Sequence, residues 1–377
     1  MTATTRTVEC SAEATLWLAF ELGSTKWTLA FTTGVGQKPR GRTIAAGDLS
    51  ALGREIAAAK ARFGLTPGTR VRSCYEAGRD GFWLHRWLVA AGVDNVVVDS
   101  SSIEVNRRAR RAKTDRLDAG KLLQLLMRWA GGERRAWSVV HVPSAEAEDA
   151  RQLTREIEAV GVDRTRVRNR IQGLLATQGV RLALTAQFEV ELTRAQTGDG
   201  RALPPGLRTR LRHEWSQLQV IEARLATLAE ERAAQIAAGA TRVAQVAQQL
   251  RRVRGVGATS AAQYAAELFG TRTFQNGRQV AALTGLVPVP YRSDQRVEDQ
   301  GISKAGRGAL RRLSVEIAWG WLRWQPHSAL TQWFARRFAA AGKRARRIGI
   351  VAVARKLIIA LWQFVDRGVI PEGAIVR

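Results

Sequence analysis

Apolar and polar positions in the first third of the chain alternate in short segments that are separated by turns. Residues 16–31 contain two apolar runs on either side of Gly23-Ser24-Thr25, and this pattern predicts a β-hairpin. Further patterns predict a strand at 42–45, a helix at 49–64, a strand at 70–78, a helix at 80–92, a strand at 93–100 and a helix that runs to about Trp129. The predicted order is three strands, then helix, strand, helix, strand, helix.

This order of elements is that of a ribonuclease-H-like domain. A doubly wound nucleotide-binding sheet would begin strand-helix-strand, whereas this chain begins with a hairpin. No Gly-rich phosphate loop follows the first strand, which argues against a nucleoside triphosphate or dinucleotide site. We therefore expect an α/β domain over residues 1–144, followed by mostly α-helical parts.

The middle of the chain has a different pattern. Residues 148–179 and 207–239 are long, charged stretches with heptad-like apolar spacing, and a loop rich in Gly and Pro separates them. They predict an antiparallel helical hairpin or coiled coil over residues 145–248, which is a candidate dimerisation arm. The alternative is that they are two surface helices of one globular body. A third domain is expected over residues 249–377.

The charge of the chain limits the classes of partner that it is expected to bind. The 377 residues include 59 Lys and Arg against 33 Asp and Glu, a formal net charge of +26, while 45% of residues are hydrophobic. The hydrophobic content indicates folded domains, and the charge predicts a polyanionic partner, because phosphate contacts release counterions. No apolar run reaches the roughly 20 residues of a membrane-spanning helix. The first residues also lack the basic-then-apolar layout of a signal peptide.

Cysteine and histidine are scarce. The two cysteines and four histidines include no pair with the spacing of zinc ligands, and two cysteines do not make a disulfide framework. The prediction is a protein of the prokaryotic cytoplasm, associated with the nucleoid and not with a membrane.

Four acidic residues occupy the positions where a ribonuclease-H-like fold places its metal ligands. Glu21 interrupts the apolar first strand, Glu76 ends the fourth, and Asp115 and Asp118 open the later helix on one helical face. Carboxylate oxygens are the ligands that Mg²⁺ prefers. Taken singly, each acid is better explained by a role other than metal binding. Glu21 would be a solvent-facing residue of an edge strand, and the aspartates would be partners of nearby arginines. Four acids at the four expected places favour a Mg²⁺ site.

Several motifs resemble those of one known family. YEAG at 75–78, KTDRLDA at 113–119, TGLVPVPYRSDQ at 284–295 and QGISKAGRGALRRL at 300–313 resemble the insertion-sequence 110 transposases, DEDD-type enzymes related to Piv DNA invertases. The resemblance covers nearly the whole chain. It implies a RuvC-like domain, a coiled-coil connector and a C-terminal transposase domain with a serine nucleophile. It also implies Mg²⁺-dependent recombination guided by a structured bridge RNA.

The sequence departs from this family pattern at two positions. Glu21 stands where such families usually have Asp, and Asp294 replaces the usual glycine after the serine. Ser293 lies where the family's serine falls, in a predicted loop after two prolines and between Arg292 and Asp294, and it is our candidate nucleophile. Ser303 is the other candidate, but its position predicts the N-cap of the next helix.

Basic residues and a glycine turn suggest where nucleic acid binds. Gly255-Val256-Gly257 joins two predicted helices within 250–270, so its backbone amides could hold a phosphate. The residues predicted to bind nucleic acid are Arg107, Arg108, Arg110, Arg111, Lys113, Arg252, Arg254, Gly255, Gly257, Lys304, Arg307 and Arg311. The first five precede the aspartate pair and would steer a phosphate backbone towards it.

The function expected from these features is that of an insertion-sequence transposase or site-specific DNA recombinase. Its partners would be double-stranded donor and target DNA and a structured guide RNA, and it would act as a homo-oligomer, a dimer or tetramer. One alternative is a RuvC-like structure-specific nuclease that hydrolyses DNA with water and needs no serine. Another is a non-catalytic nucleic-acid-binding remnant, in which Glu21 has weakened the metal site.

Overall fold

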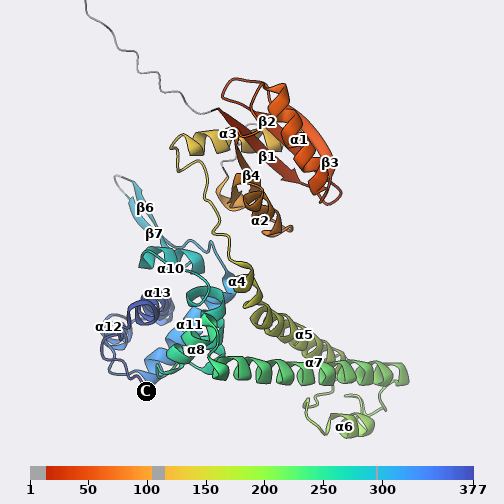
Figure 1. Cartoon of the computed structure of the whole chain (residues 1–377). Coiled ribbons are helices and arrows are strands. Elements are labelled where there is room, and N and C mark those ends of the chain that lie inside the picture. The colour runs from red at the N-terminus through yellow and green to blue at the C-terminus, as the bar shows by residue number, and fades with distance from the viewer. Residues whose placement is uncertain (1–13, 104–114, 294–295) are drawn as a thin grey trace, which may run out of the picture. The chain divides into compact units, whose positions relative to one another are not determined.

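The computed structural model describes residues 14–103, 115–293 and 296–377 (Figure 1). The chain divides into two compact units, Met1–Val142 and Pro143–Arg377. The first boundary lies near the one expected after residue 144. The expected boundary after residue 248 falls inside the second unit, and the three-domain layout stays a prediction.

Five strands of the described residues form the sheet of the first unit. They are β1 (Thr15–Leu22), β2 (Lys26–Thr32), β3 (Arg40–Ala45), β4 (Arg70–Glu76) and β5 (Val93–Val98), in the spatial order β3-β2-β1-β4-β5. The β1/β2 and β2/β3 pairs are antiparallel, whereas β1/β4 and β4/β5 are parallel. This mixed sheet is compatible with a ribonuclease-H-like fold. It also makes β1 the central strand, so the alternative that placed Glu21 on an edge strand is wrong.

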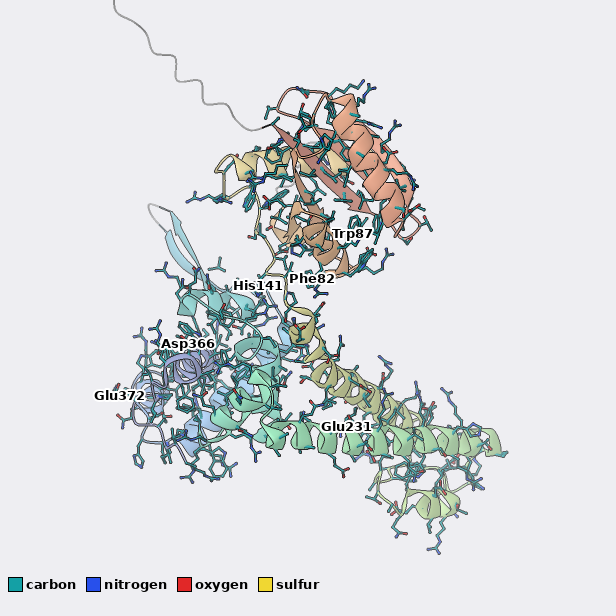
Figure 2. The ribbon with its side chains drawn as sticks, viewed as in Figure 1. Phe82, Trp87, His141, Glu231, Asp366 and Glu372 are labelled. Atoms are coloured by element: carbon teal, nitrogen blue, oxygen red, sulfur yellow. The ribbon has the colours of Figure 1, made fainter. Side chains whose placement is uncertain are left out.

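Helices cover both faces of this sheet. Leu18 and Phe20 point to the face covered by α1 (Leu49–Arg62) and α2 (Trp83–Ala90), where Phe82 and Trp87 also pack (Figure 2). Ala19 points to the opposite face, beneath α3 (Asp115–Ala130). Because side chains alternate along a strand, β1, β2, β4 and β5 each contribute to two separate cores. Asp48 caps α1 by accepting the Ala51 amide hydrogen at 2.8 Å.

Two long helices form an antiparallel pair in the second unit, after the short α4 (Ala145–Asp149). The pair is α5 (Gln152–Ala176) and α7 (Pro205–Ala238), and their apolar faces, which include Ile171 and Trp215, share a core that α6 (Phe188–Arg194) helps to close. Arg170 of α5 lies 2.7 Å from Glu214, and Arg168 lies 3.3 Å from Glu222. The predicted helical hairpin is confirmed, and its role in dimerisation stays a prediction.

The rest of the second unit packs around a helical core. Its elements are α8 (Arg242–Arg251), α9 (Ala258–Tyr264), a π-helical segment (Ala265–Phe269), α10 (Gly277–Thr284), β6 (Pro288–Ser293), β7 (Arg296–Ile302), α11 (Gly308–Trp324), α12 (Ala329–Phe338) and α13 (Lys343–Arg367). Trp321 and Leu361 are fully buried there. By length and composition alone α13 is apolar enough to cross a membrane, but 56% of its most apolar window is buried, as in a core helix.

Two local expectations in this region are wrong. Ser293 is the last residue of β6 and pairs with Arg296 of β7, so it ends a hairpin strand and is not in an open loop. Ser303 is not a helix N-cap, since α11 begins at Gly308 with Arg307 as its cap residue. The Ser303 amide instead donates to the Val287 carbonyl at 2.8 Å, which prolongs the hairpin pairing.

Candidate active site

Glu21 and Glu76 lie next to each other at the carboxyl ends of two parallel strands. Phe20 of β1 is paired with Tyr75 of β4, so the following residues, Glu21 and Glu76, come level with one another. Ala19 lies two positions before Glu21 in β1, and Cys74 lies two positions before Glu76 in β4. Ala19 and Cys74 both pack beneath α3. The alternation of strand side chains therefore places both carboxylates on the α3 face of the sheet. Glu21 is half-buried, and Glu76 is exposed.

The beginning of α3 lies over the same part of the sheet. Leu117 and Ala119 share a groove of about 360 Å³ with Thr28, the strand partner of Glu21 on β2. The Cys74 Sγ lies 3.7 Å from the carbonyl oxygen of Leu122, one helical turn after Asp118. This packing brings the first turns of α3 to the face that carries the two glutamates.

The structure describes the side chain of Asp118 but not that of Asp115. The Asp118 side chain is 24% exposed and lies 3.5 Å from the Lys121 ammonium. Asp115 is the first residue of α3, and its side chain lies outside the described residues, as do Arg107, Arg108, Arg110, Arg111 and Lys113 altogether. In the part of the chain that is described, no three His, Cys, Asp or Glu side chains are close enough to hold a metal ion.

The donor set is nevertheless of the kind that suits Mg²⁺. Three described carboxylates, those of Glu21, Glu76 and Asp118, belong to elements that meet on one face of the sheet. Their hard oxygen atoms match the preference of this cation, which commonly uses one or two carboxylates together with water. A closed site would require movement of long glutamate side chains and the participation of Asp115. The tetrad stays a prediction.

The candidate nucleophile is carried by a short two-stranded hairpin. Backbone bonds fasten the base of this hairpin to the end of α10, since Lys304 N–H donates to the Gly285 carbonyl at 3.2 Å and Arg307 N–H donates to that of Leu283 at 3.2 Å. Lys304 has a φ of 55°, which is uncommon for a residue with a side chain. We call residues 283–287 together with 303–307 the hairpin base.

Two glycines make the close approach within the hairpin base possible. A Cβ atom at Gly285, where φ is +68°, would lie 2.1 Å from the Ala305 carbonyl oxygen. A Cβ atom at Gly306, where φ is +97°, would lie 2.4 Å from that of Leu283. Neither position can accept a side chain without moving backbone. The sequence showed these glycines, but the contacts that require them join segments about twenty residues apart.

Several predicted nucleic-acid contacts have partners inside the protein. Arg311 Nη1 donates to the Lys304 carbonyl at 3.1 Å and to that of Thr284 at 3.3 Å, and so it braces the hairpin base. Arg252 Nε donates to the Arg377 carbonyl at 3.1 Å, and the Arg254 guanidinium stacks 5.7 Å from the Trp324 ring. An arginine has five N–H donors, so these bonds leave capacity for phosphate, and the binding roles stay predictions.

The predicted glycine turn joins α8 and α9 as expected. Gly255 has a φ of +92°, and a Cβ atom there would lie 3.3 Å from the Cβ of Trp324. Gly257 is the N-cap residue of α9, which has no side-chain cap. Seven residues are too few for the helix end alone to define a phosphate site, so Gly255 and Gly257 also stay predictions.

A buried ionic cluster, not anticipated from the sequence, joins α5 to α11. Glu267, in the π-helical segment, is only 4% exposed and contacts Arg307, while Arg155 of α5 lies 3.3 Å from it. Arg307 also lies 2.7 Å from Glu158. Burial lowers the pKa of Arg307, but its contacts with Glu267 and Glu158 outweigh that effect and raise the pKa overall. In the sequence, the only indication of this cluster that we find is that Glu267 interrupts the apolar run AAELF at 265–269.

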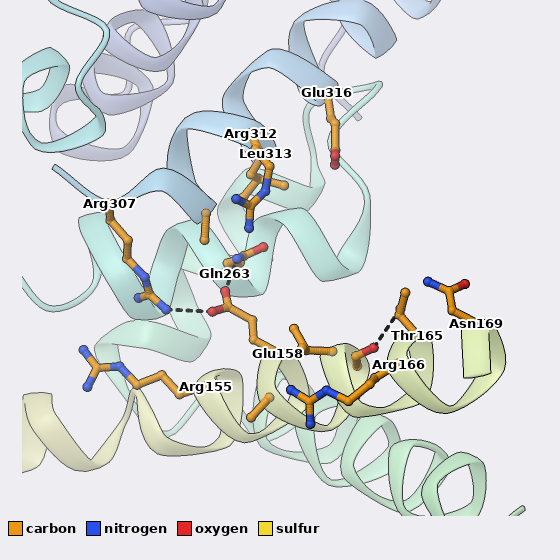
Figure 3. A pocket seen from close by; sticks show the side chains of 14 residues that line it. Arg155, Glu158, Thr165, Arg166, Asn169, Gln263, Arg307, Arg312, Leu313 and Glu316 are labelled. Carbon is orange, nitrogen blue, oxygen red and sulfur yellow. Dashed lines mark hydrogen bonds and ion pairs between the residues drawn. The ribbon is translucent and has the colours of Figure 1, made fainter. Parts of the chain in front are cut away.

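A polar groove lies beside this cluster. Its volume is about 780 Å³, and α5 and α11 supply most of its walls (Figure 3). Figure 3 shows Glu158 reaching from α5 to both Arg307 and Gln263, so this carboxylate closes one end. Both signs of charge line the groove, because Arg312 and Glu316 face it from α11. This mixture does not select an anion.

Comparisons with known proteins identify the class of this protein, which is that of the transposases. Residues 247–332 match the model of the "Transposase IS116/IS110/IS902 family". The chain is 39% identical over 376 residues to the putative transposase y4rJ of Sinorhizobium fredii (strain NBRC 101917 / NGR234), covering 96% of this chain and 94% of that one. This chain therefore belongs to the IS116/IS110/IS902 family of transposases.

Two further relatives agree with this assignment. The putative transposase y4qE of the same Sinorhizobium fredii strain is 28% identical over 323 residues, covering 77% of this chain and 74% of that one. The transposase for insertion sequence element IS1533 of Leptospira borgpetersenii is 29% identical over 118 residues, covering 31% of this chain and 32% of that one.

Proposed function

We propose that this transposase cleaves and rejoins DNA through a covalent bond between Ser293 and phosphate, with Mg²⁺ held by Glu21, Glu76, Asp115 and Asp118. The observation that carries the proposal is the level pairing of Glu21 and Glu76 on the face covered by α3. Two carboxylates side by side repel one another and have a purpose if a cation lies between them. The other two acids open the helix that covers this face.

The chemistry needs no high-energy cofactor. The Ser293 Oγ loses its proton and forms a bond to phosphorus, while the bond from phosphorus to the 3′ oxygen breaks. The departing 3′ oxygen takes up a proton and leaves as a hydroxyl. Attack by a 3′ hydroxyl on the serine phosphodiester reverses these changes and rejoins strands, so the bond energy is conserved. When bound, Mg²⁺ supplies a Lewis acid that stabilises the charge developing around phosphorus.

The hairpin base supports the assignment of Ser293 over Ser303. Ser303 N–H is bonded to Val287, and the neighbouring Lys304 and Arg307 amides are bonded to α10 and the residue after it. Ser303 is thus part of the fastening. Ser293 lies at the opposite end of β6, where the hairpin turns. A nucleophile has to reach a phosphate in the backbone of a DNA strand, and a projecting hairpin end suits that task better than its base.

The guide RNA and the oligomer belong to the same proposal. They are expected from the resemblance in the KTDRLDA and QGISKAGRGALRR segments, and the net charge of +26 suits two nucleic-acid partners. The antiparallel α5/α7 pair offers an arm for association between copies. Recombination should require the RNA transcribed from the non-coding DNA that flanks the gene.

A trapping experiment tests the nucleophile. Purified protein, Mg²⁺, the flanking RNA and plasmid DNA carrying the element ends are mixed, then denatured to reveal protein joined to DNA. We expect Ser293→Ala to abolish the adduct and Ser303→Ala, the matched control, to retain it. Cleavage that persists in Ser293→Ala without any adduct would instead identify a nuclease that uses water. DNA binding without any Mg²⁺-dependent cleavage would identify a non-catalytic protein.

A further inference from the structure

A second groove lies between α13 and the base of the serine hairpin. It has a volume of about 340 Å³, and its floor is apolar, formed by Leu286, Pro288 and Ile302 from the hairpin side. Ile348 and Val351 of α13 complete the floor. Ile348 is 56% exposed, which is high for a large aliphatic side chain in a helix.

Three arginines surround this apolar floor. Arg344, Arg347 and Arg355 lie on the same face of α13 as Ile348 and Val351, because their spacing follows the helical repeat. Counting only described residues, none of the three makes an ion pair or hydrogen bond with another side chain or carbonyl. The first turn of α13 also contains no acidic residue. Among the residues whose side chains are described, the groove therefore presents three arginines around a hydrophobic surface.

This combination matches the two halves of a nucleotide. A base presents an apolar face, and its neighbouring phosphates carry negative charge that guanidinium groups bind as bidentate partners. Small-molecule pockets start at about 300 Å³, so a groove of about 340 Å³ has room for one nucleotide and not for a duplex. A base inside a duplex is stacked on both faces, so only an unpaired base could enter.

The groove is also within reach of the proposed reaction. Ser293 follows Pro288, which lies at the groove, by five positions along β6. At a rise of about 3.3 Å per residue this distance is roughly 16 Å. Nucleotides along a duplex strand rise about 3.4 Å each, so the groove could receive a base within about five positions of the phosphate attacked by Ser293.

We infer that this groove binds the base of an unpaired nucleotide, with Arg344, Arg347 and Arg355 on the adjoining phosphates. The inference rests on the nucleic-acid partner of the proposed function, but neither on Ser293 chemistry nor on Mg²⁺. Near the cleavage site a strand must separate from its complement before it can be exchanged. A pocket that holds one separated base would stabilise that open state.

Binding of short oligonucleotides tests the inference. The full-length Ser293→Ala protein, without Mg²⁺, is titrated with a fluorescent 12-nucleotide single strand and with the same strand carrying three central abasic sites. We expect Ile348→Ala to weaken binding of the intact strand about tenfold and to leave the abasic strand nearly unchanged. Ile370→Ala, at an exposed isoleucine outside the groove, is the matched control and should alter neither.

The salt dependence of oligonucleotide binding tests the role of the three arginines separately. Arg347→Ala should reduce the slope of log K against log salt by about 0.7, the value for one phosphate contact on a single strand, and should weaken the preference for the intact strand. Arg346→Ala, the neighbouring exposed residue outside the groove, should leave that preference unchanged.

Two results would overturn the inference. One is an equal loss of affinity for intact and abasic strands in Ile348→Ala, which would mean that no base enters the groove. The other is Ile348-dependent binding of an acidic amphipathic peptide in place of the oligonucleotide, which would identify a protein partner. Because no cleavage takes place in these titrations, failure of the trapping experiment would leave their outcome intact, and the reverse also holds.

Discussion

At the scale of single residues, Glu21 is the most informative side chain of the first unit. It lies in the central strand β1 between Thr28 of β2 and Glu76 of β4, in a position that would ordinarily hold an apolar residue. Glutamate reaches one methylene further than the aspartate expected from the family resemblance, so the proposed Mg²⁺ site would have to accommodate a longer ligand.

Substitution of Glu21 separates the metal-binding role from a packing role. We expect Glu21→Gln, which keeps the shape and removes the charge, to slow Mg²⁺-dependent adduct formation by at least about 100-fold. Glu21→Asp should retain activity, since it restores the usual ligand. The rate of adduct formation at saturating DNA is the measurement, and circular dichroism checks the fold.

Asp94→Asn provides the matched acidic control for this prediction. Asp94 lies on β5, which pairs with β4, and it forms ion pairs with Arg70 at 2.7 Å and Arg72 at 3.1 Å. Its loss should leave the rate within about twofold of the unmodified protein, because an exposed ion pair contributes little. Full activity in Glu21→Gln would exclude Glu21 as a ligand.

A buried polar chain makes the stability of the first unit depend on pH. The Ser73 hydroxyl donates to Asn95 Oδ1 at 2.7 Å, and the Asn95 amide lies 2.9 Å from His85 Nδ1. This second bond requires Nδ1 without a proton, so it favours neutral His85. Burial, assisted by repulsion from Arg86, lowers the pKa of His85 below its ordinary value of 6.5.

The sign of the pH effect follows from this lowered pKa. Between the folded pKa and 6.5 the unfolded chain binds more protons, so the stabilisation is present above about pH 6.5 and is lost as the pH falls towards the folded pKa. The melting temperature of the first unit should therefore fall between pH 7 and pH 5. His85→Gln should flatten this dependence, whereas His213→Gln in the second unit should not. An unchanged slope in His85→Gln would assign the effect to other groups.

At the scale of elements, the hairpin base determines where the serine hairpin projects. Gly285 ends α10 in a left-handed conformation, and the segment before α11 closes directly over it. Arg311 of α11 bonds two carbonyls of the same region. Three elements that are separate in sequence are thus joined at one point, and Ser293 lies one strand length away from it.

Alanine at Gly285 should disrupt this junction. The left-handed conformation alone costs about 1–2 kcal/mol with a side chain, and the 2.1 Å approach to Ala305 should add about 1–3 kcal/mol. Gly368→Ala, at the equally left-handed end of α13 with nothing within 4 Å, should show only the first cost. Calorimetry gives the stabilities, and hydrogen exchange of the 303–307 amides reports the local opening. Equal losses at the two positions would mean that the hairpin base relaxes freely.

At the scale of the whole molecule, charge determines how the protein meets nucleic acid. The net charge of +26 is spread over both units, and part of it is already paired inside the protein, as at Arg307 and Arg155. The unpaired remainder would contact phosphates and release counterions. The α5/α7 pair illustrates the division, since Arg168 and Arg170 of α5 are paired with glutamates of α7 and cannot contribute their full charge to binding.

Salt should therefore control affinity strongly. With about six to ten phosphate contacts, binding of a 40-base-pair duplex should weaken about 10³- to 10⁵-fold between 50 and 200 mM salt. Fluorescence anisotropy without Mg²⁺ measures this dependence over the whole range. A slope of log K against log salt shallower than about −2 would mean that most of the positive charge is compensated within the folded protein.

Sequence patterns were sufficient to predict elements and candidate site residues wherever the interactions that form them are local. Apolar alternation predicted β1, β2 and β4 to within two residues, and the interruptions of those patterns picked out Glu21 and Glu76. Periodicity likewise predicted the antiparallel α5/α7 pair. Such patterns fail where the partner is remote, and Ser303 is the clearest case, because its amide bonds to Val287 in place of capping a helix.

The sequence by itself determined the order of elements, the positive charge and the positions of four acids along the chain. Only the tertiary structure decided that β1 is central, that Glu21 and Glu76 stand level on one face, and that Arg307 and Arg311 brace the protein from within. The physical reason is that periodicity records which face of an element is buried. Which segment buries that face depends on contacts between residues far apart in the chain.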